Sequence, residues 1–367
     1  MNLPQMPEPA VVESIESIWG AELQPVGCNE CERVFLIEPS LVDQETCPAC
    51  GIGMLSAQPV LMRGEPPEVL VPNAVNQHQL QSILTEFVNG VWLHSDDFTS
   101  QSLFARARQI FIPMWLVDSD IAGVWQAESG YDYEVKSSEE YYSGGSWLSR
   151  DKIETRIRWE PRAGQVQRHY DNVAVAALTD FQGLQAKIGG FDFSKSQRYQ
   201  PESLDNALIR VPDIHQDSAW SDVQSSLHRL AAKDCQLASN AQHIRDYSIK
   251  AGYENLNWTQ LLLPVFVTWY TDDTGQPQIV HVNGQNGKIS GLRLASQRKG
   301  WKWASIIIGV AALVFIAGLL LLALGALLPP VVTMGVLLIV AALIISVAAM
   351  VPVAWPWQWN RKQDHRL

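Results

Sequence analysis

Two Cys-x-x-Cys pairs stand near the start of the chain, Cys28 with Cys31 and Cys47 with Cys50, and fifteen residues separate them. Two such pairs at this spacing are typical of a structural metal site, in which each pair forms a tight turn and the four thiolates complete a tetrahedral set. Four sulfur ligands leave no open coordination position, so the pattern predicts a structural zinc ion. The alternative, two unrelated redox pairs, lacks the βαβ context that a thioredoxin-like motif requires.

The residues around the cysteines predict how they are positioned. Gly27 precedes the first pair and Gly51 follows the second, and both offer the backbone freedom that tight turns need. The stretch RVFLIE between the pairs predicts a strand. We therefore expect a zinc ribbon over residues 25–56. A unit this small cannot bury enough core to fold alone, so metal binding and folding should be coupled.

Acidic residues dominate the part of the chain that carries the ribbon. Residues 1–62 contain nine Asp or Glu and one basic residue, Arg33. Because neutralisation of phosphates supplies most non-specific affinity for nucleic acids, this composition argues against nucleic-acid binding. Five cysteines, four of them in the two pairs, fit a reducing compartment, and residues 1–20 do not resemble a secretory signal. We expect the soluble part to be cytosolic.

Residues 1–24 form an acidic amphipathic segment. A helix here would place four apolar residues on one face: Val12, Ile15, Trp19 and Leu23. Helices that bind bilayers usually carry Lys or Arg on the polar face, which this one lacks, so bilayer binding is not expected. Docking onto another protein and packing against its own domain both remain open as the role of this segment.

Residues 65–297 predict a mostly antiparallel α+β domain. One helix should present Leu80, Ile83, Leu84, Phe87 and Val88 on one face, and another Trp220, Val223, Leu227 and Leu230. FIPMWLVDSDIAGVWQAESGYDYEV predicts a strand pair, KIETRIRWEPRAGQVQRHYDNVAVAAL a hairpin that turns at EPRAG, and the last segment strands that turn at DDTGQ and NGQNGK. FIPMWLV and LLPVFVTWY suggest an internal repeat, each an apolar strand around a proline.

No catalytic motif stands out in this domain. GQNGKI lacks the earlier glycine of a phosphate-binding loop, the histidines are scattered, and Cys235 is expected to be a small buried hydrophobe. Arg156, Arg158 and Arg168 could form a basic stripe on one hairpin face. Two interpretations of that stripe stay open, an anion or lipid headgroup site and an ordinary solvated face.

Residues 298–367 predict a transmembrane hairpin. No charged residue lies between Trp303 and Asn360, and this window contains apolar runs at 304–328 and 331–351. About 20 apolar residues suffice for a helix to cross a bilayer, so both runs are long enough. Pro329 and Pro330 predict a tight turn between two antiparallel helices. Residues 304–351 are thus the part expected to contact the lipid bilayer.

The flanks of the hairpin predict its orientation. Basic residues lie at its two outer ends: Arg298, Lys299, Lys302, Arg361, Lys362 and Arg366. Under the positive-inside rule both termini are then cytoplasmic, in the cell (inner) membrane. Five tryptophans at the same end predict an aromatic belt at the interface: Trp301, Trp303, Trp355, Trp357 and Trp359. Gly318 and Gly325, and Ala341 and Ala348, are one heptad apart and favour close helix contact, and homo-oligomers could form through them.

This order of features resembles a family of bacterial zinc-ribbon membrane proteins. The resemblance rests on the knuckles CNEC and CPACG, on PMWLVDSD, on LLLPVFV with VNGQNGKISG, and on the terminal membrane helices. Members of that family are often labelled primosomal or helicase-like zinc-ribbon proteins, but this chain has no helicase motor motif. The resemblance implies a membrane-anchored cytosolic module, and some relatives accompany membrane-stress or band-7-type scaffold proteins.

Three hypotheses for function follow. The first is a non-enzymatic, membrane-anchored adaptor that presents a docking surface to a protein partner. The second is a membrane-tethered, nucleic-acid-associated protein, which would show binding that weakens steeply with salt. The third is an enzyme with a pocket in the middle domain near Arg156 and Arg158. Because no catalytic motif is present and the ribbon is acidic, the sequence favours the adaptor.

Overall fold

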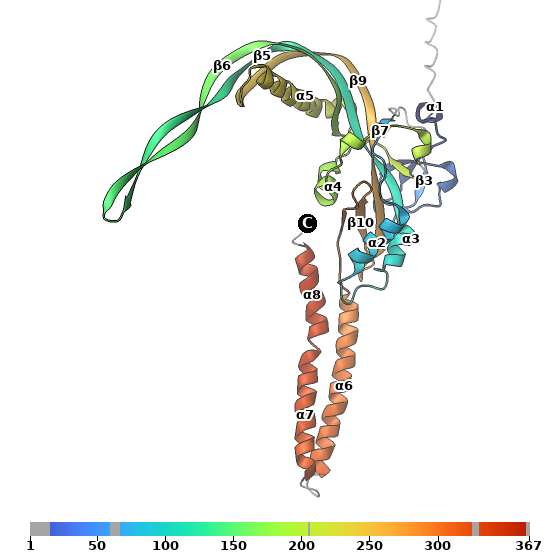
Figure 1. The fold of residues 1–367 in the computed structure, drawn as a ribbon. Coiled ribbons are helices and arrows are strands. Elements are labelled where there is room, and N and C mark those ends of the chain that lie inside the picture. The colour runs from blue at the N-terminus through green and yellow to red at the C-terminus, as the bar shows by residue number, and fades with distance from the viewer. Residues whose placement is uncertain (1–14, 59–66, 205, 325–329, 365–367) are drawn as a thin grey trace, which may run out of the picture.

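The computed structural model describes residues 15–58, 67–204, 206–324 and 330–364 (Figure 1). Within these residues the chain has an α+β fold with one mixed sheet and two long apolar helices at its C-terminal end. The predicted fold class is confirmed at this level.

Eleven strands form the sheet in the described part of the chain. They are β1 (Gln24–Cys28), β2 (Val34–Ile37), β3 (Leu55–Ala57), β4 (Pro67–Leu70), β5 (Arg108–Ser143), β6 (Ser146–Ala176), β7 (Gln197–Arg198), β8 (Leu208–Arg210), β9 (His243–Thr271), β10 (Pro277–Asn283) and β11 (Ile289–Gly291). Their order is β11-β10-β9-β5-β8-β2-β1-β3, with β6 on β5, β4 on β9 and β7 on β4. The β4–β9 and β5–β8 pairs are parallel and the others antiparallel, so the sheet is mixed.

Eight α-helices accompany the sheet in the same residues. They are α1 (Ile15–Trp19), α2 (Gln77–Val88), α3 (Ser100–Arg106), α4 (Phe181–Ile188), α5 (Gln216–Ala238), α6 (Gln297–Leu324), α7 (Pro330–Ala348) and α8 (Val351–Asp364), with 3-10 turns at Pro39–Leu41, Phe193–Lys195 and Pro201–Leu204. Predicted helix α2 is confirmed: Leu80, Leu84 and Phe87 are buried, and Asn76 with Gln79 forms a capping box at its start.

Three of the strands are very long and build a curved arm that projects from the body (Figure 1). The predicted strand pair in the first of these segments is wrong, because β5 is one continuous strand of 36 residues. The predicted turn at EPRAG is also wrong, because β6 passes through it with Pro161 opposite Glu128. β6 pairs with β5 alone among the described strands, and an edge strand tolerates a residue without an N–H.

The two proline-centred segments that suggested a repeat lie side by side, with Pro113 of β5 opposite Leu262 of β9 and Phe111 opposite Pro264. Each proline lies at a position where its own strand ends its pairing with one neighbouring strand and begins to pair with another. Pro113 lies between the residues of β5 that pair with β8 and those that pair with β6, and Pro264 lies between the partners of β4 and of β10. A proline cannot donate to a ladder, so these junctions are positions that it can occupy inside a sheet.

Helix α5 covers the concave side of the arm (Figure 1). Val223 and Leu227 are buried against Val117 and Ile121 of β5, as the predicted helical face requires. Leu230 is exposed and Trp220 only partly buried, because the buried face repeats every four residues, at Ala219, Val223, Leu227 and Ala231. β9 pairs with β5 only as far as Gly130. Beyond this residue, β6 is the one described strand that pairs with β5.

The N-terminal helix ends earlier than predicted. α1 ends at Trp19, and Gly20 follows with a φ of 63°, so Leu23 lies beyond the helix, while Val12 falls outside the described residues. Trp19 is buried in a cluster with Leu36 and packs edge-on against Tyr199. The described part of this segment therefore packs against its own domain.

The C-terminal helices form a stem below the body, in which α6 and α7 lie side by side (Figure 1). Two helices here are long and apolar enough to cross a membrane, and only 11% and 17% of the residues in their most apolar windows are buried. The predicted segments 304–328 and 331–351 fall within α6, α7 and the start of α8, except for a turn at residues 349–350 and for residues 325–328, which lie outside the described residues. Ala342 and Ala349 are buried, one residue beyond Ala341 and Ala348.

Helix α8 was not predicted, and it returns to the body. Trp355 and Trp359 stack with their ring centroids 5.2 Å apart, and Trp92 meets Trp355 edge-on. The side chain of Asn360 bonds both the N–H and the carbonyl of Ala295, at 2.8 and 2.9 Å. Thus Trp355 and Trp359 pack against the domain, while the other three of the predicted aromatic belt are exposed: Trp301, Trp303 and Trp357.

Candidate metal centre

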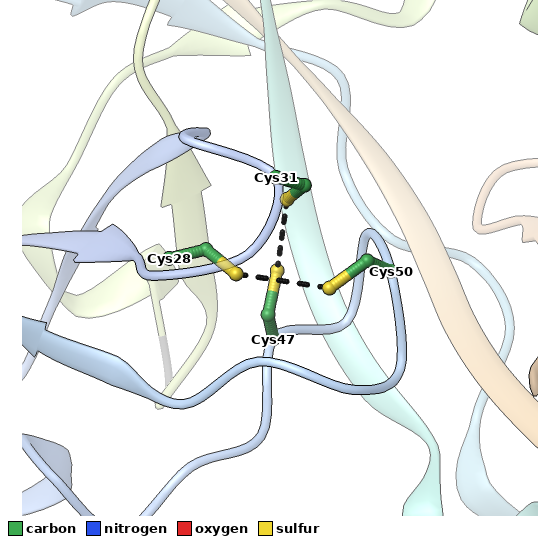
Figure 2. A group of neighbouring side chains, drawn as sticks. All are labelled: Cys28, Cys31, Cys47 and Cys50. Carbon is green, nitrogen blue, oxygen red and sulfur yellow. Dashed lines mark hydrogen bonds between the residues drawn. The ribbon is translucent and has the colours of Figure 1, made fainter.

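The four paired cysteines come together at one point beside the sheet (Figure 2). Their sulfur atoms all lie within 4.8 Å of one another, and the Cys28–Cys50 and Cys31–Cys47 separations are both 3.7 Å. A tetrahedral site with metal–sulfur bonds of about 2.3 Å has sulfur atoms about 3.8 Å apart. All four are free cysteines, so this donor set could hold a metal ion.

The two knuckles have matching backbones. The N–H of Glu32 donates to the carbonyl of Cys28 at 3.1 Å, and the N–H of Gly51 donates to the carbonyl of Cys47 at 2.8 Å. Glu32 and Gly51 occupy equivalent places, one residue after each pair, and both have left-handed φ values, 58° and 69°. Each knuckle is thus a turn closed around its own pair of sulfurs.

Backbone N–H groups point at the sulfurs. Glu30 donates to Sγ of Cys28 and Gly53 donates to Sγ of Cys50, each at 3.4 Å. Such bonds stabilise thiolates, the form in which cysteine binds metals. A Cβ at position 53 would lie 2.4 Å from Sγ of Cys28, so the close approach of this backbone requires glycine. The local geometry fits a metal ion held by four sulfurs.

Burial sets the protonation of these thiols. Cys28 and Cys47 are buried, and Cys31 and Cys50 are partly buried. Burial raises the pKa of the Cys47 and Cys31 thiols, so protons compete with a metal at these positions. For Cys50, burial acts in the same direction, but hydrogen bonds from the backbone of Gly53 and Ile52 outweigh it and lower the pKa.

The metal centre is joined to the main sheet. β2 pairs with β8, with Phe35 opposite Arg210, and Cys28 and Cys47 belong to the same buried cluster as Phe35 and Ile110. An ion pair of 2.9 Å between Arg108 and Glu45 ties the second knuckle to the start of β5. The positions of the four sulfur atoms therefore depend on the packing of the central strands, and that packing depends in turn on the two knuckles.

The predicted basic stripe has a different environment. Arg156 lies 3.4 Å from Glu154, Arg158 lies 3.0 Å from Glu160, and Arg168 reaches Asp234 of α5 at 3.2 Å. All three arginines lie on one strand, β6, and not on a hairpin of their own. Each is thus already beside a carboxylate on the exposed arm.

A groove of about 400 Å³ lies next to the metal centre, and sequence analysis did not identify it. We call it the basic groove, after four of the residues that line it: Arg33, Lys187, Arg210 and His281. These residues come from the first knuckle, α4, β8 and β10. No motif links segments so far apart in the chain, so only the fold brings the four together.

Comparison with known proteins adds no family to these observations: no protein-family model, no curated protein and no solved structure matches this chain.

Proposed function

We propose that the chain is a membrane-anchored adaptor. In this proposal α6 and α7 span the cell membrane, the metal centre holds a structural zinc ion, and the arm presents a docking element to a protein partner in the cytosol. The resemblance to bacterial zinc-ribbon membrane proteins and a link to band-7-type scaffolds belong to the same proposal.

The anchor is supported by the exposure and the flanks of the two apolar helices. Apolar side chains cover the outside of both, as in Leu313, Leu337 and Ile344. A soluble core helix would bury such residues, and a bilayer accepts them without cost. The basic residues of α6 and α8 stand at the end of the stem nearest the body, which under the positive-inside rule supports a cytoplasmic body.

Zinc is supported by the donor set. Tetrahedral sites with four thiolates favour zinc or iron, and of the two zinc has no redox chemistry to disturb a buried structural site. With all four positions filled by cysteine, no place remains for a substrate or an activated water. The metal therefore acts as a staple that joins the two knuckles to each other.

The tip of the arm carries the adaptor proposal. β5 and β6 continue beyond Gly130 as a two-stranded ribbon, and Gly144 and Gly145 turn it at its end. Four large apolar residues at this end are exposed: Tyr141, Tyr142, Trp147 and Leu148, with Trp147 at 70%. Tyrosine and tryptophan are the residues most enriched at the centres of protein interfaces, because they bury a large area at a small entropic cost.

The reach of the arm also favours docking. Beyond Gly130, β5 continues for 13 residues, which at about 3.3 Å per residue extend on the order of 40 Å past the end of its pairing with β9. An isolated two-stranded ribbon is marginally stable in water, and the aromatic tip adds nothing to the core of its own domain. Burial of the exposed aromatic residues of the tip in a partner would supply the stabilisation that the ribbon does not receive from its own domain.

Photo-crosslinking in native membranes tests the proposal. A photoreactive benzoyl-phenylalanine in place of Trp147 should give a discrete adduct with one protein, and the same probe in place of Leu237, an exposed residue of α5, should not. Tyr142→Ser should weaken the adduct, because Tyr142 is an exposed aromatic residue next to position 147, with the two ring centroids 5.5 Å apart in the parent chain. Adducts with lipid or nucleic acid alone, or the same proteins at both positions, would contradict the adaptor proposal.

A further inference from the structure

The basic groove has the form of a ligand site. It lies between the first knuckle, α4 and the strands of the body, and its volume of about 400 Å³ falls in the range of small-molecule sites. Most such sites combine an apolar lining with a few polar groups that fix orientation. The basic groove has both parts, and the proposed adaptor function uses neither.

The floor of the groove is aliphatic. Ile110 and Ile112 of β5 and Val265 and Val267 of β9 line it, and Ile279 of β10 continues the surface. Four of these five residues are buried in the core cluster beneath, so the floor is rigid. The accessible apolar surface of the groove comes mainly from the partly exposed Ala49, Leu184 and Ile279, which an alkyl chain would cover and a free inorganic anion would not.

The rim of the groove is cationic. Arg210 is nearly buried, with a side chain 9% exposed, and bonds Asp180 and Asp213, each at 2.9 Å. Arg33 bonds the same Asp180 at 3.1 Å. These pairs hold both guanidinium groups in place, and the two carboxylates balance the two arginine charges.

Lys187 is the cation that no carboxylate balances. It projects from α4 at the rim, and among the described residues no carboxylate lies within 4 Å of its ammonium group. His281 faces the same space. Burial, with the nearby charges of Lys187, Arg33 and Arg210, lowers the pKa of His281 to about 4, as expected in a site of positive potential.

A second groove extends the first toward the stem. It has a volume of about 860 Å³ and shares Lys187, Ile279 and His281 with the basic groove. At its other end it is lined by Arg293 and by Gln363 of α8, the helix that follows the apolar stem. The two grooves thus adjoin at Lys187, Ile279 and His281, and the second reaches α8, the helix that follows the stem.

We propose that the basic groove binds a single-chain fatty acid, with its carboxylate at Lys187 beside the two arginines and its alkyl chain on the aliphatic floor. One negative charge and one apolar chain match the one unbalanced cation and the one aliphatic surface. A phospholipid would place its second chain on the apolar residues of the second groove, such as Ile83, Phe87 and Leu292, and the competition experiment below separates this case. The site goes beyond the adaptor function and does not depend on it.

The test uses the full chain in nanodiscs of phosphatidylcholine. The probe is a palmitic acid analogue with a diazirine near the end of its chain, and the crosslinked peptides are identified by mass spectrometry. We expect labels on the peptides of β5 or β9 that contain Ile110 or Val265. Excess palmitate should remove the label, and hexadecanol, which has the same chain without the charge, should not.

Two variants probe the two halves of the site. Gly183 of α4 lines the groove, and a Cβ there meets no heavy atom within 4 Å, so Gly183→Leu adds bulk without a clash and should abolish labelling. Lys187→Gln removes the free charge and should weaken binding about tenfold. Gly183→Ala and Lys195→Gln, the latter at an exposed lysine outside the groove, are the matched controls and should bind like the parent chain.

Each other outcome would overturn the inference. Full labelling of Gly183→Leu, or labels confined to α6 and α7, would place the probe in the bilayer. If hexadecanol displaced the probe as well as palmitate does, the cations of the groove would have no part in binding. Stronger competition by phosphatidylglycerol than by palmitate would assign the groove to a phospholipid. The melting temperature of each variant in nanodiscs separates a lost site from a lost fold.

Discussion

Gly318 of α6 and Gly335 of α7 face each other so closely that a Cβ on either would lie 3.1 or 3.0 Å from the carbonyl oxygen of the other. Ile339 and Leu322 close the contact, each 2.9 Å from where such a Cβ would stand. Small residues let two helices approach in a membrane, where packing supplies much of the attraction. This pair therefore sets the distance between the two helices of the stem.

Gly318→Leu should separate these helices. The larger side chain must displace Ile339 or the backbone of α7, and overpacking of this kind typically costs about 1–3 kcal/mol. We expect a lower melting temperature in detergent, measured by differential scanning fluorimetry. Gly309→Leu is the control on the same helix, because a Cβ at Gly309 meets no heavy atom within 4 Å. Equal effects of the two changes would show that the Gly318 contact does not hold the stem.

Cys47→Ser should remove the metal from the chain, while Cys235→Ser should not. Both cysteines are buried, but Cys235 lies on α5, 3.8 Å from the hydroxyl of Tyr247 and outside the metal centre. Mass spectrometry of the purified chain should find about one zinc per molecule, lost only in the first variant. Because the metal centre shares a core cluster with Ile110, its loss should also lower the melting temperature. Iron as the main metal would refute the zinc assignment.

The stability of the body should depend on His281 between pH 4 and 6.5. In the unfolded chain a histidine takes up a proton near pH 6.5, but in the folded chain burial lowers the pKa of His281 to about 4. The unfolded state thus binds more protons in this window, and stability falls as the pH falls through it. The full effect is on the order of 3 kcal/mol.

Melting curves at pH 7 and pH 5 measure this dependence. His281→Gln should flatten the difference between the two, whereas His78→Gln, at an exposed position on α2, should leave it unchanged. A parent chain and a His281→Gln chain with the same pH dependence would show that another group carries it.

Asn360→Ala should loosen the junction between the stem and the body. The two hydrogen bonds from this side chain to Ala295 would be lost, and the indole N–H of Trp359, which donates to the carbonyl of Arg293 at 2.6 Å, would remain. We expect a loss of about 1–2 kcal/mol and faster proteolysis between β11 and α6. Gln358→Ala, on the exposed side of α8, is the control. Unchanged proteolysis would mean that α8 docks through its tryptophans alone.

The sequence by itself determined the features that depend on short-range spacing. The two Cys-x-x-Cys turns, the strand Val34–Ile37 between them, the helix Gln77–Val88 and the apolar segments of the stem all follow from patterns within a few turns of chain. Such patterns act locally, because a turn, a helical face or an apolar run depends mainly on neighbouring residues.

Only the tertiary structure decided where the long strands end. Pro161 predicts a turn when the sequence is read alone, yet β6 continues because β5 pairs with it along its whole length and its other edge needs no donor. Helix α8 likewise continues through a proline, Pro356, and it lies against Ala295 and Trp92 of the body. Long-range pairing overrides local preference in both cases, since burial and hydrogen bonds supply more free energy than the propensity of a single residue.

The basic groove depends entirely on the fold. Arg33, Lys187, Arg210 and His281 are spread over most of the chain ahead of the two apolar helices, and each has an ordinary local sequence. They meet because β2, β8 and β5 are successive strands of the sheet and α4 packs against that sheet beside β10. A metal knuckle can be recognised from its spacing, but a site whose residues meet only through sheet order has no pattern along the chain.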